Sequence, residues 1–218
     1  MFREIQLLTA SQVAQLRSIA ASANFVDGRI SNPHSKVKQN LHLHDDAAFQ
    51  QSSQLLMQAL LAHEDFRNFA FPVAITPPLI TRYGKGMRYG VHPDAAFIRL
   101  PTASIRSDLS CTIFLSDPTS YEGGALRIHL GTRDLRFRGA AGSAIVYPSN
   151  QLHEVEEVTA GERLVAIAFI QSQVFEAYHR ELLYELNEVA ALEGLKMSFE
   201  NFSRLQLVQQ NLLRLWSG

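Results

Sequence analysis

The spacing of apolar residues changes twice along the chain. In two early segments, 9–23 and 45–62, apolar positions recur every three or four residues, as on one face of an amphipathic helix. Thr9 stands three positions before Gln12, a capping-box pattern that favours a helix start. We therefore expect two helices before residue 63.

After Pro72 the apolar runs become short and are separated by Gly, Pro, Asp and Asn. They span residues 78–83, 87–91, 109–116, 124–130, 133–138, 143–147, 152–158 and 163–171. Several short strands with turn residues between them are typical of a β-sandwich or barrel and not of parallel βαβ units. The middle of the chain is therefore predicted to be mainly β.

From about residue 173 helical spacing returns. One apolar stripe includes Val174, Ala177, Tyr178, Leu182 and Leu183, and a later one includes Leu205, Val208, Leu212 and Leu215. The chain has no repeats and no linker that would separate independent domains. We predict an α+β chain in which residues 1–172 form one domain, with N-terminal helices within 9–62 and a β core over about 73–172. Residues 173–218 are expected to form a helical extension packed on that core, or a seam in a homodimer.

Composition narrows the class of protein. The 218 residues are 46% hydrophobic and 19% charged, as in ordinary folded proteins. The formal net charge is −1 and there is no basic stretch, so we expect neither nucleic acid nor a membrane surface as the partner. A single cysteine, no signal-peptide pattern and no run of about 20 apolar residues indicate a soluble cytoplasmic protein.

Candidate metal ligands lie in the β region. His92 and Asp94 are two positions apart, so in an extended segment both side chains point to the same side. His153 lies in a second strand-like run that a double-stranded β-helix could bring opposite this pair. Two imidazoles and one carboxylate on one face of an octahedron are the ligand set of non-haem iron(II) oxygenases. His-x-Asp alone is common by chance, and its simpler interpretation is a polar turn.

Arg163 strengthens the metal hypothesis. It begins a strongly apolar run, and an arginine that faces into a barrel is costly unless it meets a carboxylate. A guanidinium can bind both oxygens of the C5 carboxylate of 2-oxoglutarate, and the Tyr83 hydroxyl could donate to the same group. The simpler interpretation of Arg163 is a surface salt bridge with Glu162 or Glu157.

The motifs in this region match a known family. The segment Arg82-Tyr83-Gly84-Lys85-Gly86-Met87-Arg88-Tyr89-Gly90-Val91-His92-Pro93-Asp94 resembles the start of the active site in prolyl-4-hydroxylase-like oxygenases, and the chain is more closely similar to bacterial PKHD-type hydroxylases associated with iron uptake. Further matches are Val26-Asp27-Gly28-Arg29, Val37-Lys38-Gln39-Asn40, Arg106-Ser107-Asp108-Leu109-Ser110, Phe114-Leu115-Ser116-Asp117-Pro118, Tyr121-Glu122-Gly123-Gly124-Ala125-Leu126 and Val146-Tyr147-Pro148-Ser149. The resemblance extends to the C-terminal Asn211-Leu212-Leu213-Arg214-Leu215-Trp216.

The resemblance implies a double-stranded β-helix (jelly roll, cupin-like) flanked by helices. It implies a 2-oxoglutarate-dependent dioxygenase that hydroxylates a C–H bond and releases succinate and CO2. It implies Fe(2+) on His92, Asp94 and His153, 2-oxoglutarate on Arg163, and O2, and it allows L-ascorbate as a further cofactor. Where animal prolyl hydroxylases carry a tyrosine that touches the cosubstrate, this chain has Phe114. The substrate stays open between a protein side chain and a small molecule.

Two other functions use the same three ligands. A cupin-like metal-binding or sensing protein would need no buried arginine aimed at a dicarboxylate. A zinc hydrolase would need a general base, and none is evident.

Two histidines, two glycines and one connecting segment remain to be interpreted. His42 and His44 precede two aspartates, which we interpret as helix capping with solvated histidines and not as a second metal site. Gly123 and Gly124 are expected to permit a tight turn or close backbone approach. The segment 95–108 either shapes access to the site or simply connects two strands.

Overall fold

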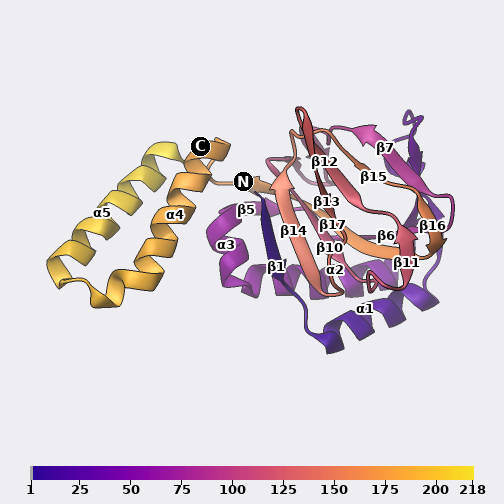
Figure 1. Cartoon of the computed structure of the whole chain (residues 1–218), viewed down its shortest axis with the longest axis horizontal. Coiled ribbons are helices and arrows are strands. Elements are labelled where there is room, and N and C mark those ends of the chain that lie inside the picture. The colour runs from indigo at the N-terminus through magenta and orange to yellow at the C-terminus, as the bar shows by residue number, and fades with distance from the viewer. Residues whose placement is uncertain (1) are drawn as a thin grey trace.

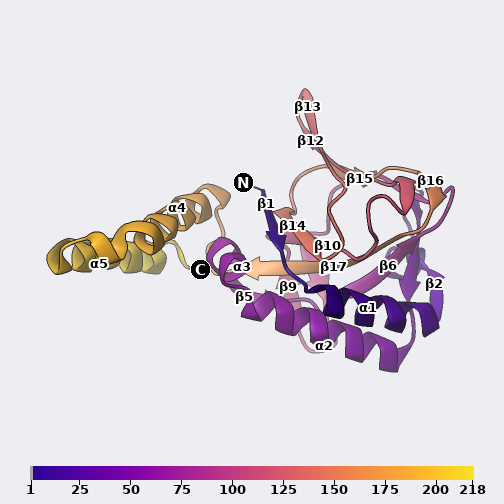
Figure 2. The ribbon, with the colours of Figure 1, turned by 60° about the horizontal axis from the view of Figure 1, so that its bottom comes forward.

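A computed structural model describes residues 2–218 of the chain. Two sheets of antiparallel strands face each other, and helices cover the outer face of the larger sheet (Figures 1 and 2). The larger sheet has the strand order β1 (Arg3–Gln6), β14 (Ser143–Pro148), β10 (Leu109–Phe114), β17 (Arg163–Ser172), β6 (Leu79–Tyr83), β4 (Leu41–Leu43), β2 (Phe25–Asp27), and β5 (Pro72–Ile75) also pairs with β17. The predicted double-stranded β-helix is thus confirmed.

The smaller sheet carries most of the candidate metal ligands. Its order is β13 (Arg133–Phe137), β12 (Leu126–Leu130), β15 (His153–Val155), β7 (Arg88–His92), β3 (Lys38–Gln39). Two short two-stranded pairs complete the β structure, namely β11 (Tyr121–Gly123) with β16 (Val158–Gly161), and β8 (Phe97–Arg99) with β9 (Ser104–Arg106).

Alternation along the central strands separates two apolar layers. On β17, Leu164, Ala166 and Ala168 face the helices, while Arg163 and Val165 lie on the opposite face, toward the smaller sheet. The first layer packs against α1 (Ala10–Ser22), α2 (Asp46–Ala62) and α3 (Glu64–Ala70), which lie together on the larger sheet (Figure 2). The second layer fills the space between the sheets and borders the site.

The early helices begin where capping residues predict. The Thr9 side chain accepts from the Gln12 backbone while the Gln12 side chain accepts from the Thr9 backbone, so the capping box is present. Asp45 caps α2 by accepting from the Ala48 backbone N–H. The predicted helices over 9–23 and 45–62 are therefore confirmed to within a residue at each end.

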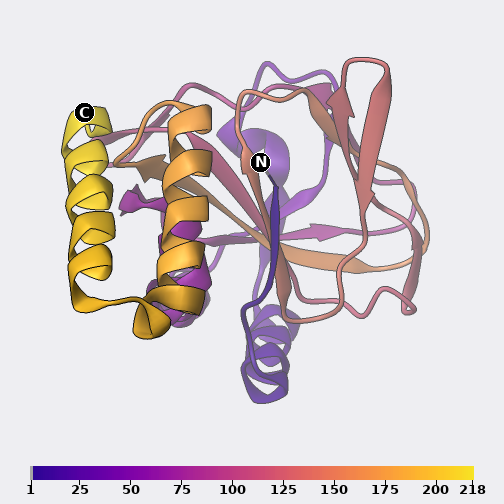
Figure 3. The ribbon, with the colours of Figure 1, turned by 60° about the vertical axis from the view of Figure 1, so that its left-hand side comes forward.

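The last part of the chain forms an antiparallel helical pair, α4 (Ala177–Glu193) and α5 (Phe199–Trp216), joined by the 3₁₀ turn η2 (Gly194–Lys196) (Figure 3). The pair extends to one side of the β structure (Figure 1). It is attached through α3, where the Tyr184 ring packs edge-on against Phe69 at 5.7 Å and the Tyr184 hydroxyl donates to Asp65 at 3.1 Å.

Several short elements were not predicted. β1, β2, β3, β4 and the 3₁₀ turn η1 (Gly28–Ser31) occupy segments for which no helix or strand was predicted. The expected strand over 152–158 is two strands, since β15 pairs with β7 and β12 whereas β16 pairs with β11. Strands of two to four residues contain too few positions to show alternation, so only their partners define them. Across residues 2–218, no helix has the length and apolar content that crossing a membrane requires.

Candidate metal and cosubstrate site

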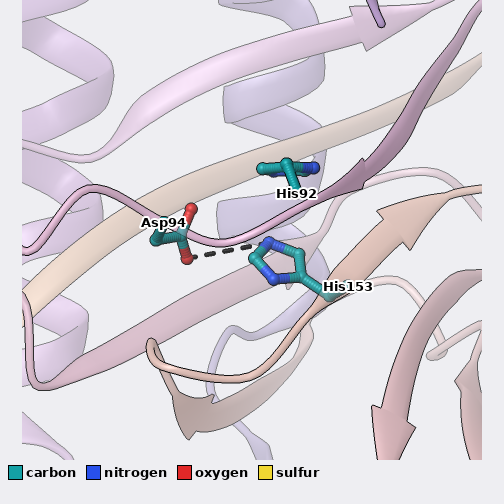
Figure 4. Close-up of side chains that lie close together, drawn as sticks. All are labelled: His92, Asp94 and His153. Carbon is teal, nitrogen blue, oxygen red and sulfur yellow. Dashed lines mark ion pairs between the residues drawn. The ribbon is translucent and has the colours of Figure 1, made fainter.

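The three predicted metal ligands converge at the edge of the smaller sheet. His92 ends β7 and lies directly opposite His153, the first residue of the antiparallel strand β15. Asp94 follows β7 by two residues and points to the same place (Figure 4). One ligand atom from each of the three side chains lies within 4.8 Å of the others, and His153 Nε2 is 3.6 Å from Asp94 Oδ2.

Backbone carbonyls orient both imidazoles. His92 Nδ1 is 2.8 Å from the Gly90 oxygen, and His153 Nδ1 is 3.0 Å from the Gln151 oxygen. When each Nδ1–H donates to its carbonyl, each Nε2 keeps a lone pair for a metal. Burial and the neighbouring His153 lower the pKa of His92 to about 4, so its ring is neutral at physiological pH.

Asp94 is held by hydroxyl groups. Its Oδ2 accepts from Ser110 Oγ at 2.5 Å, Ser110 Oγ lies 2.7 Å from Ser149 Oγ, and Ser107 Oγ donates to Ser149 Oγ at 2.8 Å. Burial raises the pKa of Asp94, because the carboxylate loses the stabilisation that water gives its charge. A divalent cation between the three side chains would supply that stabilisation. Two imidazoles and one carboxylate, with the remaining directions unblocked by other protein ligands, fit iron(II).

A cavity of about 730 Å³ connects the metal ligands to the interior of the β-helix. Its volume is in the range of small-molecule sites. Ile98, Leu100 and Pro101 of the segment 95–108 line it. The segment forms the β8–β9 hairpin, so it supplies part of the cavity wall as well as connecting two strands.

Arg163 lies at the inner part of this cavity. It is 1% exposed, and among residues 2–218 it makes no ion pair. Glu162 instead lies 3.4 Å from Arg82, and Glu157 lies 3.8 Å from Arg88. The surface salt bridge considered for Arg163 is therefore wrong. Burial lowers the pKa of Arg163, and its Nε and Nη1 atoms are buried without a hydrogen-bond partner.

Aromatic rings surround the guanidinium. Arg163 pairs with Tyr83 in the β6–β17 register, and its Cζ lies 5.1 Å from the Tyr83 ring centre and 5.9 Å from that of Phe114. The Tyr83 hydroxyl accepts from Asn40 Nδ2 at 2.9 Å and still has its own proton to donate. Burial raises the pKa of Tyr83, which keeps that proton in place.

Two adjacent glycines bring the β11–β12 connection close to Arg163. Gly123 and Gly124 have φ of +70° and +61°, a region that glycine adopts without steric cost. A Cβ on Gly124 would lie 3.1 Å from Arg163 Cδ and 2.8 Å from Val158 Cγ2. Of the two roles considered for these glycines, a tight turn or close backbone approach, the close approach is confirmed.

The structure also places residues in the cavity that sequence reasoning missed. Lys38, Asn40 and His42 all line it and are each less than 8% exposed. The interpretation of His42 as solvated is wrong, whereas the capping by Asp45 is confirmed. The signal available was polar residues at alternate positions in an extended segment. Within the described part of the chain, the only cluster of potential metal ligands is the one formed by His92, Asp94 and His153.

Comparison with known families agrees with this site. The model of the 2OG-Fe(II) oxygenase superfamily matches residues 78–171, which contain all three candidate ligands and Arg163. A PKHD-type hydroxylase from Sphingopyxis alaskensis is 60% identical over 99% of both chains. A PKHD-type hydroxylase from Acaryochloris marina is 39% identical over 97% of both chains.

Solved structures share the fold at low sequence identity. A prolyl-4-hydroxylase from Pseudomonas putida aligns with a TM-score of 0.55 at 20% identity, over 78% of this chain and 92% of that one. HygX from Streptomyces hygroscopicus was solved with nickel, 2-oxoglutarate and hygromycin B bound. It aligns with a TM-score of 0.55 at 16% identity, over 80% of this chain and 84% of that one. Because a relative is 60% identical to it over nearly the full length, we conclude that this chain belongs to the PKHD-type hydroxylases, enzymes of the 2OG-Fe(II) oxygenase superfamily.

Proposed function

We propose that this enzyme uses iron(II), 2-oxoglutarate and O2 to hydroxylate an unactivated C–H bond, with release of succinate and CO2. The observation that carries the proposal is a single cavity with two kinds of unsatisfied group. One is a set of three convergent metal ligands, and the other is a buried arginine with free donors and no acidic partner. When bound, iron(II) and 2-oxoglutarate supply the oxidising power that side chains lack.

Each residue has a specific role in this proposal. His92 and His153 would bind iron through Nε2, and Asp94 through its carboxylate. The buried Arg163 guanidinium would bind the C5 carboxylate of 2-oxoglutarate with the donors that are free in the structure. The Tyr83 hydroxyl would donate to the same carboxylate. HygX, which has the same fold, binds nickel and 2-oxoglutarate, and this supports a metal and cosubstrate together in such a cavity.

The substrate class and cellular role are also proposals. The resemblance to hydroxylases associated with iron uptake supports a link to that process, with a small molecule or a protein side chain as the substrate. L-ascorbate would serve to keep the iron reduced. A cytoplasmic location is supported by the single buried cysteine, Cys111.

The test begins with anaerobic protein that is loaded with iron(II) and then titrated with 2-oxoglutarate. We expect a visible charge-transfer absorption band from the chelate, followed by succinate formation when O2 is admitted. His92→Ala should abolish iron retention and succinate formation together. Arg163→Met should retain iron but weaken 2-oxoglutarate binding by about 100-fold, roughly 3 kcal/mol, because it removes the charged fork.

Arg88→Met is the matched control, since Arg88 is 57% exposed and pairs with Glu157 outside the cavity. Its 2-oxoglutarate affinity should equal that of the wild type. Arg163→Met should also unfold at no lower denaturant concentration than the wild type without ligands, because it removes an unpaired buried charge. Iron binding with no response to 2-oxoglutarate would favour the cupin-like metal-binding alternative over the oxygenase.

A further inference from the structure

One short segment crosses between the two sheets at the cavity. Lys38 pairs with Tyr89 of the smaller sheet, and four residues later His42 pairs with Thr81 of the larger sheet. The segment is extended, so alternate side chains point the same way. Lys38, Asn40 and His42 are buried and line the cavity, whereas Gln39 between them is exposed.

Lys38 is a buried cation without an acidic partner. Its Nζ donates to Ser31 Oγ at 2.8 Å and lies 5.2 Å from the Tyr89 ring centre. None of the aspartates and glutamates in residues 2–218 lies within ion-pair distance of it. Asp27 is bonded to Arg29, and Asp94 is bonded to Ser110 and belongs to the metal ligands. An ammonium has three donors, and only one is used here.

Lys38 and Arg163 occupy different parts of the cavity wall. Arg163 lies beside Tyr83 in the larger sheet. Lys38 lies over Tyr89, whose ring stacks on His92 at 3.5 Å between ring centres. The cavity wall therefore has one cation deep in the larger sheet and a second beside Tyr89, whose ring contacts the metal ligand His92. A cosubstrate carboxylate on Arg163 leaves the second cation free.

We propose that Lys38 binds an anionic oxygen group, a carboxylate or a phosphate, of the molecule that this enzyme hydroxylates. The inference rests on the proposed function of the site. His42 Nε2, which is buried without a partner, offers a hydrogen-bonding position for a polar group of the same molecule. Ile98 and Leu100 provide apolar contact for its remainder. The substrate is therefore a small organic anion, or a side chain that carries such a group.

Calorimetric titration of the anaerobic iron(II) and 2-oxoglutarate complex tests the proposal, with three ring compounds of similar size as probes. Benzoate and phenyl phosphate carry the two candidate anions, and benzamide is neutral. Wild-type protein should bind at least one anion about ten-fold more tightly than benzamide. The preferred anion distinguishes a carboxylate from a phosphate.

Two variants assign this preference to Lys38. Lys38→Met should lower affinity for the preferred anion by about ten-fold and leave benzamide binding unchanged, whereas Lys38→Arg should keep anion affinity within about three-fold. Both variants should bind 2-oxoglutarate like the wild type. Equal binding of all three probes by the wild type would overturn the proposal, and this result does not depend on whether the variants fold. Wild-type affinity for the anion in Lys38→Met would overturn it as well.

The loading step separates this proposal from the proposed function. If the iron(II) and 2-oxoglutarate complex does not form, the oxygenase proposal fails. The same three probes are then titrated into protein loaded with zinc alone. A Lys38-dependent preference for an anion in that experiment would keep the anion site while rejecting the oxygenase, and its absence would reject both.

Discussion

At the scale of single residues, the position of Asp94 depends on serine hydroxyls. The chain of hydrogen bonds from Ser107 through Ser149 and Ser110 ends on Asp94 Oδ2. Partners that orient a metal ligand in this way affect affinity almost as directly as the ligand itself. Ser110 is therefore a positioning residue for the proposed iron site.

Ser110→Ala should weaken iron(II) binding by about 10-fold to 100-fold, because the carboxylate loses its hydrogen-bond donor. The metal affinity is measured by competition with a chelator. Ser107→Ala, two hydrogen bonds further from the carboxylate, serves as the control and should have a smaller effect. Equal affinities for Ser110→Ala and the wild type would show that the backbone alone positions Asp94.

His42 and His92 make the metal-free protein sensitive to acid. Burial lowers the pKa of each to about 4, whereas an unfolded histidine titrates near 6.5. Between these values the unfolded chain binds protons that the folded chain does not. The free energy of unfolding is thus complete above about pH 6.5 and decreases as the pH falls toward about 4.

The metal-free protein should lose stability between pH 7 and pH 4.5, and in His42→Gln this loss should be smaller by about 2 kcal/mol. Urea unfolding at the two pH values measures the loss. The exposed neighbour His44 provides the control, since His44→Gln should retain the full loss. An unchanged pH dependence in His42→Gln would mean that His42 is already protonated, or open to water, in the folded state.

At the scale of elements, the β11 bulge sets how close the backbone comes to Arg163. The β11–β16 register shifts between Glu122 and Gly123, and Gly124 follows with positive φ. A side chain on Gly124 would collide with Val158 and press on Arg163. This connection therefore links local backbone conformation to the proposed binding of the cosubstrate by Arg163.

Gly124→Ala should lower both the stability and the 2-oxoglutarate affinity. Gly86→Ala is the control, because Gly86 has a φ of +82° but no atom lies within 4 Å of the place that a Cβ would take there. Backbone strain alone should cost Gly86→Ala about 1 kcal/mol, and the contacts of Gly124 should add about 1–3 kcal/mol more. Urea unfolding and calorimetry measure the two effects. Equal stability losses would contradict the steric argument.

At the scale of the whole molecule, the α4–α5 pair leaves an apolar surface uncovered. The exposed apolar side chains on this pair and its connecting turn include Leu192, Leu195, Phe199, Leu207 and Leu215. Patches of this kind often mark protein interfaces. With a net charge of −1, two copies would repel each other weakly. We therefore keep the homodimer as a prediction, with the helical extension 173–218 as the contact between copies.

Sedimentation equilibrium tests this prediction. The wild type should have twice the mass of one chain, and Leu207→Glu combined with Leu215→Glu should have the mass of one chain. Leu135→Glu is the control, since Leu135 is 36% exposed on β13 of the smaller sheet, away from the helical pair (Figure 2). A monomeric wild type at micromolar concentration would contradict the prediction, as would a dimer that survives both glutamates.

Sequence alone predicted the elements whose periodicity extends over several residues. The ten residues of β17 form one long apolar run, which identified Arg163 at its start as unusual, although the direction of its side chain stayed open. Thr9 and Gln12 likewise predicted the start of α1 from local hydrogen bonding. The three candidate metal ligands and Arg163 were identifiable because their chemistry is unusual in an apolar β region.

Tertiary structure decided everything that depends on pairing between distant segments. β3 has only two residues, and its pairing with β7 is what turns Lys38 toward the cavity. Pairing between β7 and β15 likewise brings His153 opposite His92, although the two lie far apart along the chain. Amino-acid order encodes which face of a long element is apolar, because that preference is local. Which short strands become neighbours is decided only when the whole core packs, since each gains its hydrogen bonds from a partner far away in the chain.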